Sequence, residues 1–262
     1  MEPLQYLVGV LSGALVGLAL GLVGGGGSIL CVPLLLYGVG VGDLHLAIGT
    51  SSLAVAMSAS LNLLGHMRRG SVSGLVACLF TSGGVVGATF GSQAGKAFDG
   101  RWLSACFAIL IFLVGAIMLK FRFTPATPAL QLDRRNSTGL LVTGGFTGAV
   151  CGFFGIGGGF LIVPGLMYAG RLPILQAVGS SLVAVTAFGF TTAANYARAG
   201  WVDWQLAALL VLGSTFGGAL GIRLAERVSA QKGRLQLWFA VITFLVAGYM
   251  LYRSAYALTR PS

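Results

Sequence analysis

The feature that most constrains how this chain can fold is its succession of long apolar runs, separated by short polar stretches. The runs cover residues 4–23, 28–42, 46–66, 72–94, 102–120, 138–154, 158–170, 173–195, 203–225 and 235–257. Most of them are close to the roughly 20 residues with which an α-helix crosses a bilayer. Only 8% of the residues are charged, whereas soluble domains carry about 25%. The sequence therefore predicts an all-α polytopic membrane protein with about 8–10 transmembrane segments.

The two halves of the chain match one another on either side of a polar linker. Pro33 and Tyr37 correspond to Pro164 and Tyr168, and the offset drifts by only one or two residues along the chain. The other matching pairs are Ala47/Ala177, Gly49/Gly179, Ser51/Ser181, Val55/Val185, Arg68/Arg198, Gly70/Gly200, Gly83/Gly213, Gly87/Gly217, Gly91/Gly221, Phe107/Phe239, Ala108/Ala240, Phe112/Phe244, Leu113/Leu245, Val114/Val246, Met118/Met250 and Leu119/Leu251. We therefore predict a first repeat at 1–120, a linker at 121–137 and a second repeat at 138–262, in one integral membrane domain.

The distribution of basic residues predicts how these repeats are oriented. Each half holds five apolar runs, and an odd number inverts the second half if every run crosses. With the N-terminus on side A, eleven Lys and Arg residues fall on the opposite side B and five on side A. Side B collects Arg68, Arg69, Lys120, Arg122, Arg134, Arg135, Arg171, Arg223, Arg227, Lys232 and Arg234, and side A keeps Lys96, Arg101, Arg198, Arg253 and Arg260. Hairpins at the two short runs would give nine and seven, so the positive-inside rule favours inverted repeats with a cytoplasmic linker and both termini outside.

The net charge of +10 does not indicate a nucleic-acid-binding protein. The Lys and Arg residues are spread over short loops, and no basic face interleaved with aromatic residues is present to follow a phosphate backbone. The expected surroundings are a lipid bilayer.

Two glycine-rich stretches interrupt the apolar runs at corresponding places. The first is Gly24–Gly27 followed by Ser28, and the second is Gly155–Gly159; a proline follows each, at Pro33 and Pro164. Such a break leaves backbone N–H groups free, and proline is tolerated in the first turn of the helix that follows. Because a helix start carries free N–H donors and partial positive charge, each break is a candidate anion site. In transporters, paired breaks in two halves mark the substrate site.

Other glycines recur every four residues and predict close helix packing instead. They are Gly13, Gly17 and Gly21; Gly83, Gly87, Gly91 and Gly95; and Gly213, Gly217 and Gly221. A packing face needs one glycine per turn, whereas consecutive glycines inside a helix cost about 1 kcal/mol each relative to alanine. The consecutive glycines therefore need another explanation, which a binding site supplies.

Hydroxyl side chains cluster at the start of the apolar run that follows each break. They are Thr50, Ser51 and Ser52 in the first half and Ser180 and Ser181 in the second. They can cap a helix or donate hydrogen bonds to a bound oxyanion, and the sequence leaves both roles open. Asn62 and Asn195 lie deeper in the same runs, where amides bridge helices or contact substrate.

The sequence lacks the residues that carboxylate-coupled transport, enzyme catalysis and metal binding require. No Asp or Glu lies centrally in an apolar run, which argues against carboxylate-based coupling and suits an anionic substrate. No Gly-Lys-Ser/Thr follows the first break, and no catalytic triad, metal cluster or cofactor motif can be assembled, so we expect no enzyme. The four cysteines (Cys31, Cys78, Cys106 and Cys151) lie in apolar runs and are expected to be small buried residues.

Two further pairs of segments accompany the glycine-rich breaks and their prolines. They are Gly49-Thr50-Ser51-Ser52 with Gly179-Ser180-Ser181, and the ends Arg68-Arg69-Gly70-Ser71-Val72 with Arg198-Ala199-Gly200-Trp201-Val202-Asp203. Together, these motifs resemble the TauE/SafE sulfite exporter family. The resemblance extends over about residues 4–257 and is most specific at 21–72 and 152–204. It implies a permease for sulfur-containing anions, such as sulfite and sulfonates, in a bacterial plasma membrane. Since one fold hosts several specificities, it implies the transport class better than the substrate.

We therefore expect a transporter that works by alternating access around a site formed by the two breaks. The predicted substrate-binding residues are Gly24, Gly25, Gly26, Gly27, Ser28, Thr50, Ser51, Ser52, Gly155, Gly157, Gly158, Gly159, Ser180 and Ser181, with Asn62, Asn195 and Cys31 as weaker candidates. The rival hypotheses are a passive anion channel, a membrane thiol protein that relays sulfur or electrons through Cys31 and Cys151, and a scaffold subunit. The composition is also compatible with a homodimer.

Overall fold

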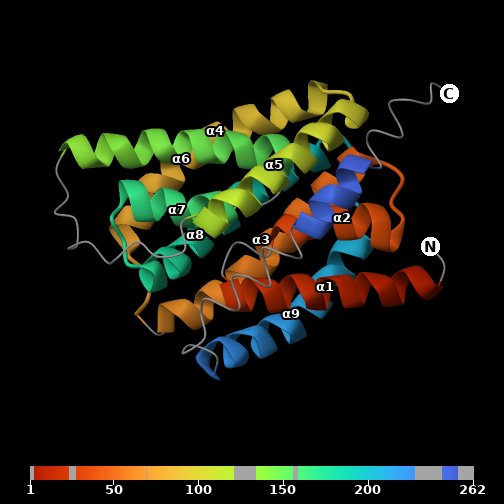
Figure 1. Ribbon diagram of the computed structural model, residues 1–262, viewed down its shortest axis with the longest axis horizontal. Coiled ribbons are helices and arrows are strands. Elements are labelled where there is room, and N and C mark those ends of the chain that lie inside the picture. Colours follow the sequence, from red (N-terminus) through yellow and green to blue (C-terminus); the bar gives the residue numbers. More distant parts are fainter. Residues whose placement is uncertain are drawn as a thin grey trace.

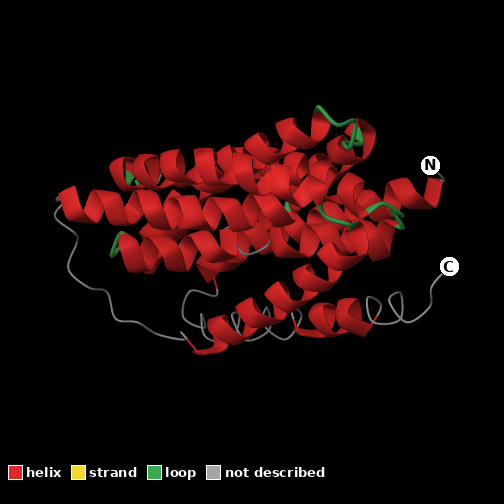
Figure 2. Ribbon diagram, turned by 90° about the horizontal axis from the view of Figure 1, so that it is seen from above, coloured by secondary structure: helices red, strands yellow, loops and turns green. Residues whose placement is uncertain are grey.

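The computed structural model describes residues 3–23, 28–68, 70–120, 134–155, 159–227 and 244–252, and every regular element in these residues is a helix (Figure 2). The elements are α1 (Pro3–Val23), α2 (Cys31–Pro33), the π-helical η2 (Leu34–Val39), α3 (Leu44–Arg68), α4 (Gly74–Ala97), α5 (Gly100–Lys120), α6 (Arg134–Phe154), α7 (Gly159–Ala169), α8 (Ile174–Ala197) and α9 (Trp204–Arg227). Residues 244–252 are also helical. The predicted all-α class is confirmed.

Several helices have the length and composition to cross a membrane. Within the described residues, five apolar spans of at least 18 residues are Leu44–Arg68, Gly74–Ala97, Ser137–Phe154, Gln176–Ala197 and Trp204–Gly221. Shorter apolar helices cover Gln5–Gly21, Ser28–Val39 and Trp102–Leu113. Large apolar side chains cover the outside of these helices, for example Phe90, Phe146 and Phe216, which are 70%, 68% and 73% exposed. An apolar exterior of this kind belongs in lipid, so the fold is that of a polytopic membrane protein.

The glycines that recur every four residues lie where helices form two close pairs, α1 with α9 and α4 with α6. The two pairs lie on opposite sides of the view in Figure 1. A Cβ atom added to Gly13 or Gly17 would overlap the carbonyl oxygen of Leu210 or Ser214. Added to Gly87, it would overlap the carbonyl oxygen of Gly145. The backbones therefore touch where the spacing of four predicts a smooth helix face.

The contacts of the two pairs are reciprocal between the halves. Gly13 lies against Leu210, and Gly144, at the place that corresponds to Gly13, lies against Phe80, which corresponds to Leu210. In the same way, the contact of Gly217 with Ala14 matches the contact of Gly87 with Gly145. Each of these contacts in one pair thus has a matching contact in the other pair.

The order of these contacts gives the relative directions of the helices in the first half. In the contacts between α1 and α9 the residue numbers of both helices increase together, from Gly13 with Leu210 to Gly17 with Ser214, so the two helices are parallel. The Ser58 and Ser214 hydroxyls are hydrogen-bonded, and Asn62 lies against Gly218, so α3 also runs parallel to α9. Because α1 and α3 run the same way, the short segment between them returns the chain to the side where α1 began.

The second half repeats this arrangement. α4 is parallel to α6, and it is also parallel to α8, because Gly84 lies against Phe188 and Ser92 is hydrogen-bonded to Asn195. The segment that contains α7 therefore returns the chain between α6 and α8.

The corresponding helices α3 and α8 lie between the two outer pairs and run antiparallel (Figure 1). Gly49, near the start of α3, contacts Tyr196 near the end of α8, and Gly189 contacts Ala56 at the crossing. These two helices are the most buried of the five apolar spans: 67% and 61% of the residues in their most apolar 18-residue stretch are buried. The core that surrounds them includes Phe80 and Phe188, whose stacked rings lie 6.4 Å apart between centroids.

Candidate functional site

The second glycine-rich break begins at Gly155, directly after α6. Gly155 has a φ of +64°, which favours glycine because other residues rarely take this conformation. A Cβ atom there would also overlap Cγ2 of Ile48 on α3. Glycine is required twice at this position, once by the backbone angle and once by the close approach of α3.

The hydroxyl cluster of the first half lies against this break of the second half. Ser52 Oγ donates to the Gly155 carbonyl oxygen at 2.9 Å, and Ser51 Oγ lies 3.4 Å from the same oxygen. Both hydroxyls are also within hydrogen-bonding distance of the Ile48 carbonyl oxygen, at 2.8 and 2.9 Å. Both serines are fully buried. The structure thus brings together two predicted motifs that are about 100 residues apart in the sequence.

Thr50 and Ser180, at corresponding places, have a different environment. The Asp203 N–H donates to Thr50 Oγ1 at 2.9 Å, next to the start of α9. The Ser73 N–H donates to Ser180 Oγ at 2.9 Å, and Ser73 is the N-cap residue of α4. Each hydroxyl therefore satisfies backbone at the start of a helix from the other half. This is a capping role, and a substrate contact for either residue stays a prediction.

The four glycines of the first break, Gly24, Gly25, Gly26 and Gly27, lie outside the described residues. Gly157 and Gly158 of the second break also lie outside them. Their predicted role stays a prediction. Ser28 and Gly159, which begin the described chain after each break, are buried. Ser181 Oγ, also buried, donates to the Val178 carbonyl oxygen at 2.7 Å.

The two hydroxyl clusters do not meet at one point. Ser52 lies beside Gly189 of α8, whose added Cβ would be 3.1 Å from the Ser52 carbonyl oxygen. Ser181 comes eight residues before Gly189 in the sequence, which places it about 12 Å away along α8 at a rise of about 1.5 Å per residue. A small anion cannot contact both clusters at once, so they are two separate polar positions along the α3–α8 pair.

The two buried asparagines join helices of different halves, as their structural interpretation predicts. Asn195 Nδ2 donates to Ser92 Oγ at 2.7 Å, and the Asn195 carbonyl oxygen accepts from Lys96 Nζ at 3.2 Å. Asn62 lies against Gly218 of α9.

All four cysteines lie in the described residues, and all are free thiols. Cys31 and Cys151 are buried, as expected. The expectation is wrong for Cys78 and Cys106, which are exposed on the apolar outer faces of α4 and α5. No group of three or more His, Cys, Asp or Glu side chains that could hold a metal ion occurs in that part of the chain.

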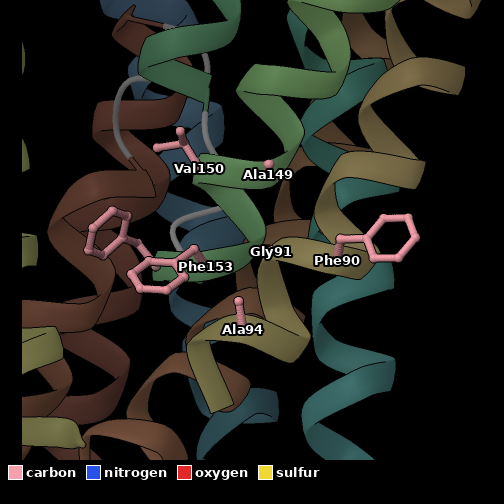
Figure 3. A pocket seen from close by; sticks show the side chains of 7 residues that line it. Phe90, Gly91, Ala94, Ala149, Val150 and Phe153 are labelled. Carbon is pink, nitrogen blue, oxygen red and sulfur yellow. The ribbon is translucent and has the colours of Figure 1, made fainter. Parts of the chain in front are cut away.

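An open apolar groove of about 370 Å³ lies between α4 and α6 (Figure 3). Its lining residues are Phe90, Gly91, Ala94, Ala149, Val150, Phe153 and Phe154. These residues supply hydrocarbon side chains and no hydrogen-bond donor, so the groove suits a lipid chain and not an anion.

One polar side chain that the sequence reasoning did not single out is Tyr196. It is fully buried near the end of α8, next to Asn195. In the sequence it looks like an interfacial tyrosine at the end of an apolar run. The only sequence signal was its place opposite His66 in the aligned repeats.

Comparisons with known proteins agree with this fold. Residues 9–250 match the family described as Sulfite exporter TauE/SafE. A probable membrane transporter protein of Xylella fastidiosa is 47% identical over 251 residues, covering 95% of this chain and 96% of the relative. The probable membrane transporter protein YunE of Bacillus subtilis is 27% identical over 278 residues, covering 97% and 100%. No solved structure matches the chain. With its all-helical fold and apolar exterior, this chain belongs to the TauE/SafE family of membrane transporters.

Proposed function

We propose that this transporter moves a small sulfur-containing anion, such as sulfite or an organosulfonate, by alternating access. The observation that carries the proposal is the contact of Ser51 and Ser52 with Gly155, where buried hydroxyl donors of one half meet the broken helix of the other. A site that joins the two halves is the place where their relative movement opens and closes access.

The chemistry of this contact favours an anion. The Ser51 and Ser52 hydroxyls rotate freely about their C–O bonds, so each can turn its proton from a carbonyl oxygen to a bound oxyanion. α7 begins at Gly159, the last residue of the break, and a helix start adds N–H donors and partial positive charge. The acidic residues Asp43, Asp99 and Asp203 all lie outside the described helices, so they do not oppose an anion inside them.

We infer that the halves are inverted repeats. The corresponding helices α3 and α8 run antiparallel, so the rotation that relates them has its axis across these helices, in the plane of a membrane that they span. The short segments at 28–39 and 159–169 then belong to crossings, because α1 and α3, like α6 and α8, run in the same direction. This supports the orientation with side B, including the linker, in the cytoplasm of a bacterial cell.

The experiment is anion uptake by proteoliposomes that contain the purified protein. Sulfite, sulfate, thiosulfate and methanesulfonate are compared with and without a pH gradient. The proposal expects saturable uptake and counterflow of at least one sulfur oxyanion. Flux without saturation or counterflow supports the passive channel instead, and no flux of any anion contradicts the proposal.

The test variant carries both Ser51→Ala and Ser52→Ala, and the control variant carries Ser82→Ala. Ser82 is an exposed serine of α4 whose hydroxyl donates to its own helix, at Leu79. Losing a hydrogen bond to a charged ligand costs about 1.5–3 kcal/mol, so we expect KM to rise by roughly 10- to 100-fold in the double variant and not in the control. A variant without Cys31 and Cys151 that keeps full uptake excludes the thiol relay.

A further inference from the structure

A second polar cluster lies at the side-A end of α8, apart from Ser51 and Ser52. Tyr196 is fully buried, and its hydroxyl has no hydrogen-bond partner in the described part of the chain. His45 Nδ1 is likewise buried without a partner there, and the His45 ring stacks on Trp201 at 4.7 Å between centroids. Of three such unpartnered side-chain atoms among the described residues, two therefore belong to this cluster. Buried hydroxyls normally find a partner, so this one calls for a function.

The Tyr196 hydroxyl lies between the two halves, close to the second break. It is 3.2 Å from the position of a Cβ atom on Gly95 of α4. The same Cβ would overlap the carbonyl oxygen of Phe153, in the last turn of α6 before Gly155. The hydroxyl is therefore at the seam where α4 of the first half meets α6 and α8 of the second.

A positively charged side chain contacts the backbone of the residue before Tyr196. Lys96 follows Gly95 on α4, is half-buried, and donates to the backbone carbonyl of Asn195, the neighbour of Tyr196, at 3.2 Å. The Lys96 ammonium group carries three donors, and its contact with the Asn195 carbonyl uses one of them. The ammonium of Lys96 on α4 and the phenol hydroxyl of Tyr196 on α8 can both donate to an incoming ligand.

The corresponding end of the other repeat differs. The counterpart of Tyr196 is His66, whose Nδ1 is hydrogen-bonded to Ser71 Oγ at 3.0 Å. The counterpart of Lys96 in the sequence is Glu226, an acidic residue. The donor pair is thus a feature of side A alone and is not imposed by the repeat.

We propose that Tyr196 and Lys96 form an anion-binding position at the side-A end of the transport path, where they determine specificity. The inference rests on the proposed function, because it assigns these residues to the same anion. A ligand with at least two oxygens accepts from the phenol hydroxyl and the ammonium at once, so the pair selects oxyanions over spherical halides. The ligand reaches the hydroxyl when the two halves separate at this seam.

The test compares Tyr196→Phe, Lys96→Gln and Lys96→Arg in proteoliposomes, with Tyr168→Phe as control. Tyr168 is 87% exposed, so its change removes a hydroxyl outside the core. We expect KM for the transported anion to rise at least tenfold in Tyr196→Phe and Lys96→Gln. We expect Lys96→Arg to keep most of the affinity and Tyr168→Phe to match the wild type. Chloride competition measured in the same vesicles is expected to strengthen in Tyr196→Phe.

Thermal unfolding of the purified variants separates binding from structure. Because the lost hydroxyl has no described partner, Tyr196→Phe is expected to be as stable as the wild type without ligand, with a smaller rise in Tm when the anion is added. A KM in Tyr196→Phe within twofold of the wild type overturns the inference, whatever Lys96→Gln shows. If the wild type transports none of the anions, the proposed function fails and takes this inference with it; if the wild type transports and Tyr196→Phe is unaltered, only the inference fails.

Discussion

Ser52 donates a 2.9 Å hydrogen bond to the carbonyl oxygen of Gly155, and this bond joins the central helix of the first half to the break of the second. The contact requires that Gly155 have no side chain, because Ile48 fills the space where a Cβ would be.

Gly155→Ala is expected to lower the transport rate at least tenfold and to lower stability. The positive φ alone costs about 1–2 kcal/mol in a residue with a Cβ, and the overlap with Ile48 adds to it. Ile48→Ala relieves the overlap with Cγ2 but creates a cavity of its own, so Gly155→Ala should cost less in an Ile48→Ala background than in the wild type. Uptake and Tm of the two single variants and the double variant measure this, and an equal cost of Gly155→Ala in both backgrounds contradicts the steric part.

Arg171 has a φ of +47°, at the place where the first half has Gly40 with a φ of +81°. We expect Arg171→Gly to raise stability by about 0.5–1 kcal/mol because it relieves a conformation that suits glycine. The matched change Gly40→Ala should lower it by about 1 kcal/mol, since a Cβ there would meet no atom within 4 Å and only the backbone changes. Denaturation in detergent measures both, and equal signs for the two changes would refute the argument.

Thr50→Val should destabilise the protein by about 1–3 kcal/mol, because it leaves the partly buried N–H of Asp203 without its acceptor. Ser180→Ala should cost a similar amount through the N–H of Ser73. The two contacts share no residue, so their effects on the free energy of unfolding should add. A thermal-shift series on the two single variants and the double variant checks this, and a clear excess in the double variant would show that the contacts are coupled.

Gly17→Ala should weaken the α1–α9 pair by several kcal/mol, because its Cβ would overlap the carbonyl oxygen of Ser214 and the backbones must separate. Gly139→Ala on α6 is the control, since a Cβ there meets no atom within 4 Å. Helix propensity predicts that the control gains about 1 kcal/mol. Yield and Tm after purification distinguish the two, and a Gly17→Ala protein as stable as the control would argue against close backbone contact.

Bulky substitution at Gly26 or Gly158 should abolish uptake while the protein stays in the membrane, if the breaks hold the substrate. Both positions lie outside the described residues, so the prediction rests on the sequence pattern. Uptake and membrane fractionation of Gly26→Val and Gly158→Val check it, and unchanged flux in both would remove the role of the breaks.

Much of the fold could be predicted because hydropathy is a local property. The runs 46–66 and 173–195 predict α3 and α8, which extend over Leu44–Arg68 and Ile174–Ala197. The glycine spacing predicted smooth helix faces, but it could not say that α1 meets α9, because a face does not encode its partner. The charge count favoured full crossings over hairpins. The shared direction of α1 and α3, which follows from the sequence of their contacts with α9, is consistent with that choice.

The candidate site was less predictable because it depends on contacts between the halves. Ser51 and Ser52 could be named from their place after the first break, but their contact with Gly155 of the second break is a tertiary feature. The capping partner of Thr50 lies 153 residues away, beyond any local pattern. Tyr196 was missed because a tyrosine at the end of an apolar run is common at membrane interfaces, and only the structure shows its burial.

The short returning segments also affect how the protein is made. The helical stretch Ser28–Val39 has 12 residues, which is about 18 Å of helix, far less than the roughly 30 Å hydrocarbon core. We therefore expect that such a segment does not insert as an independent span, and that the orientation of α1 becomes fixed only once α3 follows with Arg68 at its end. On this expectation three segments of each half insert together, and a change in α3 should misorient α1 without touching it.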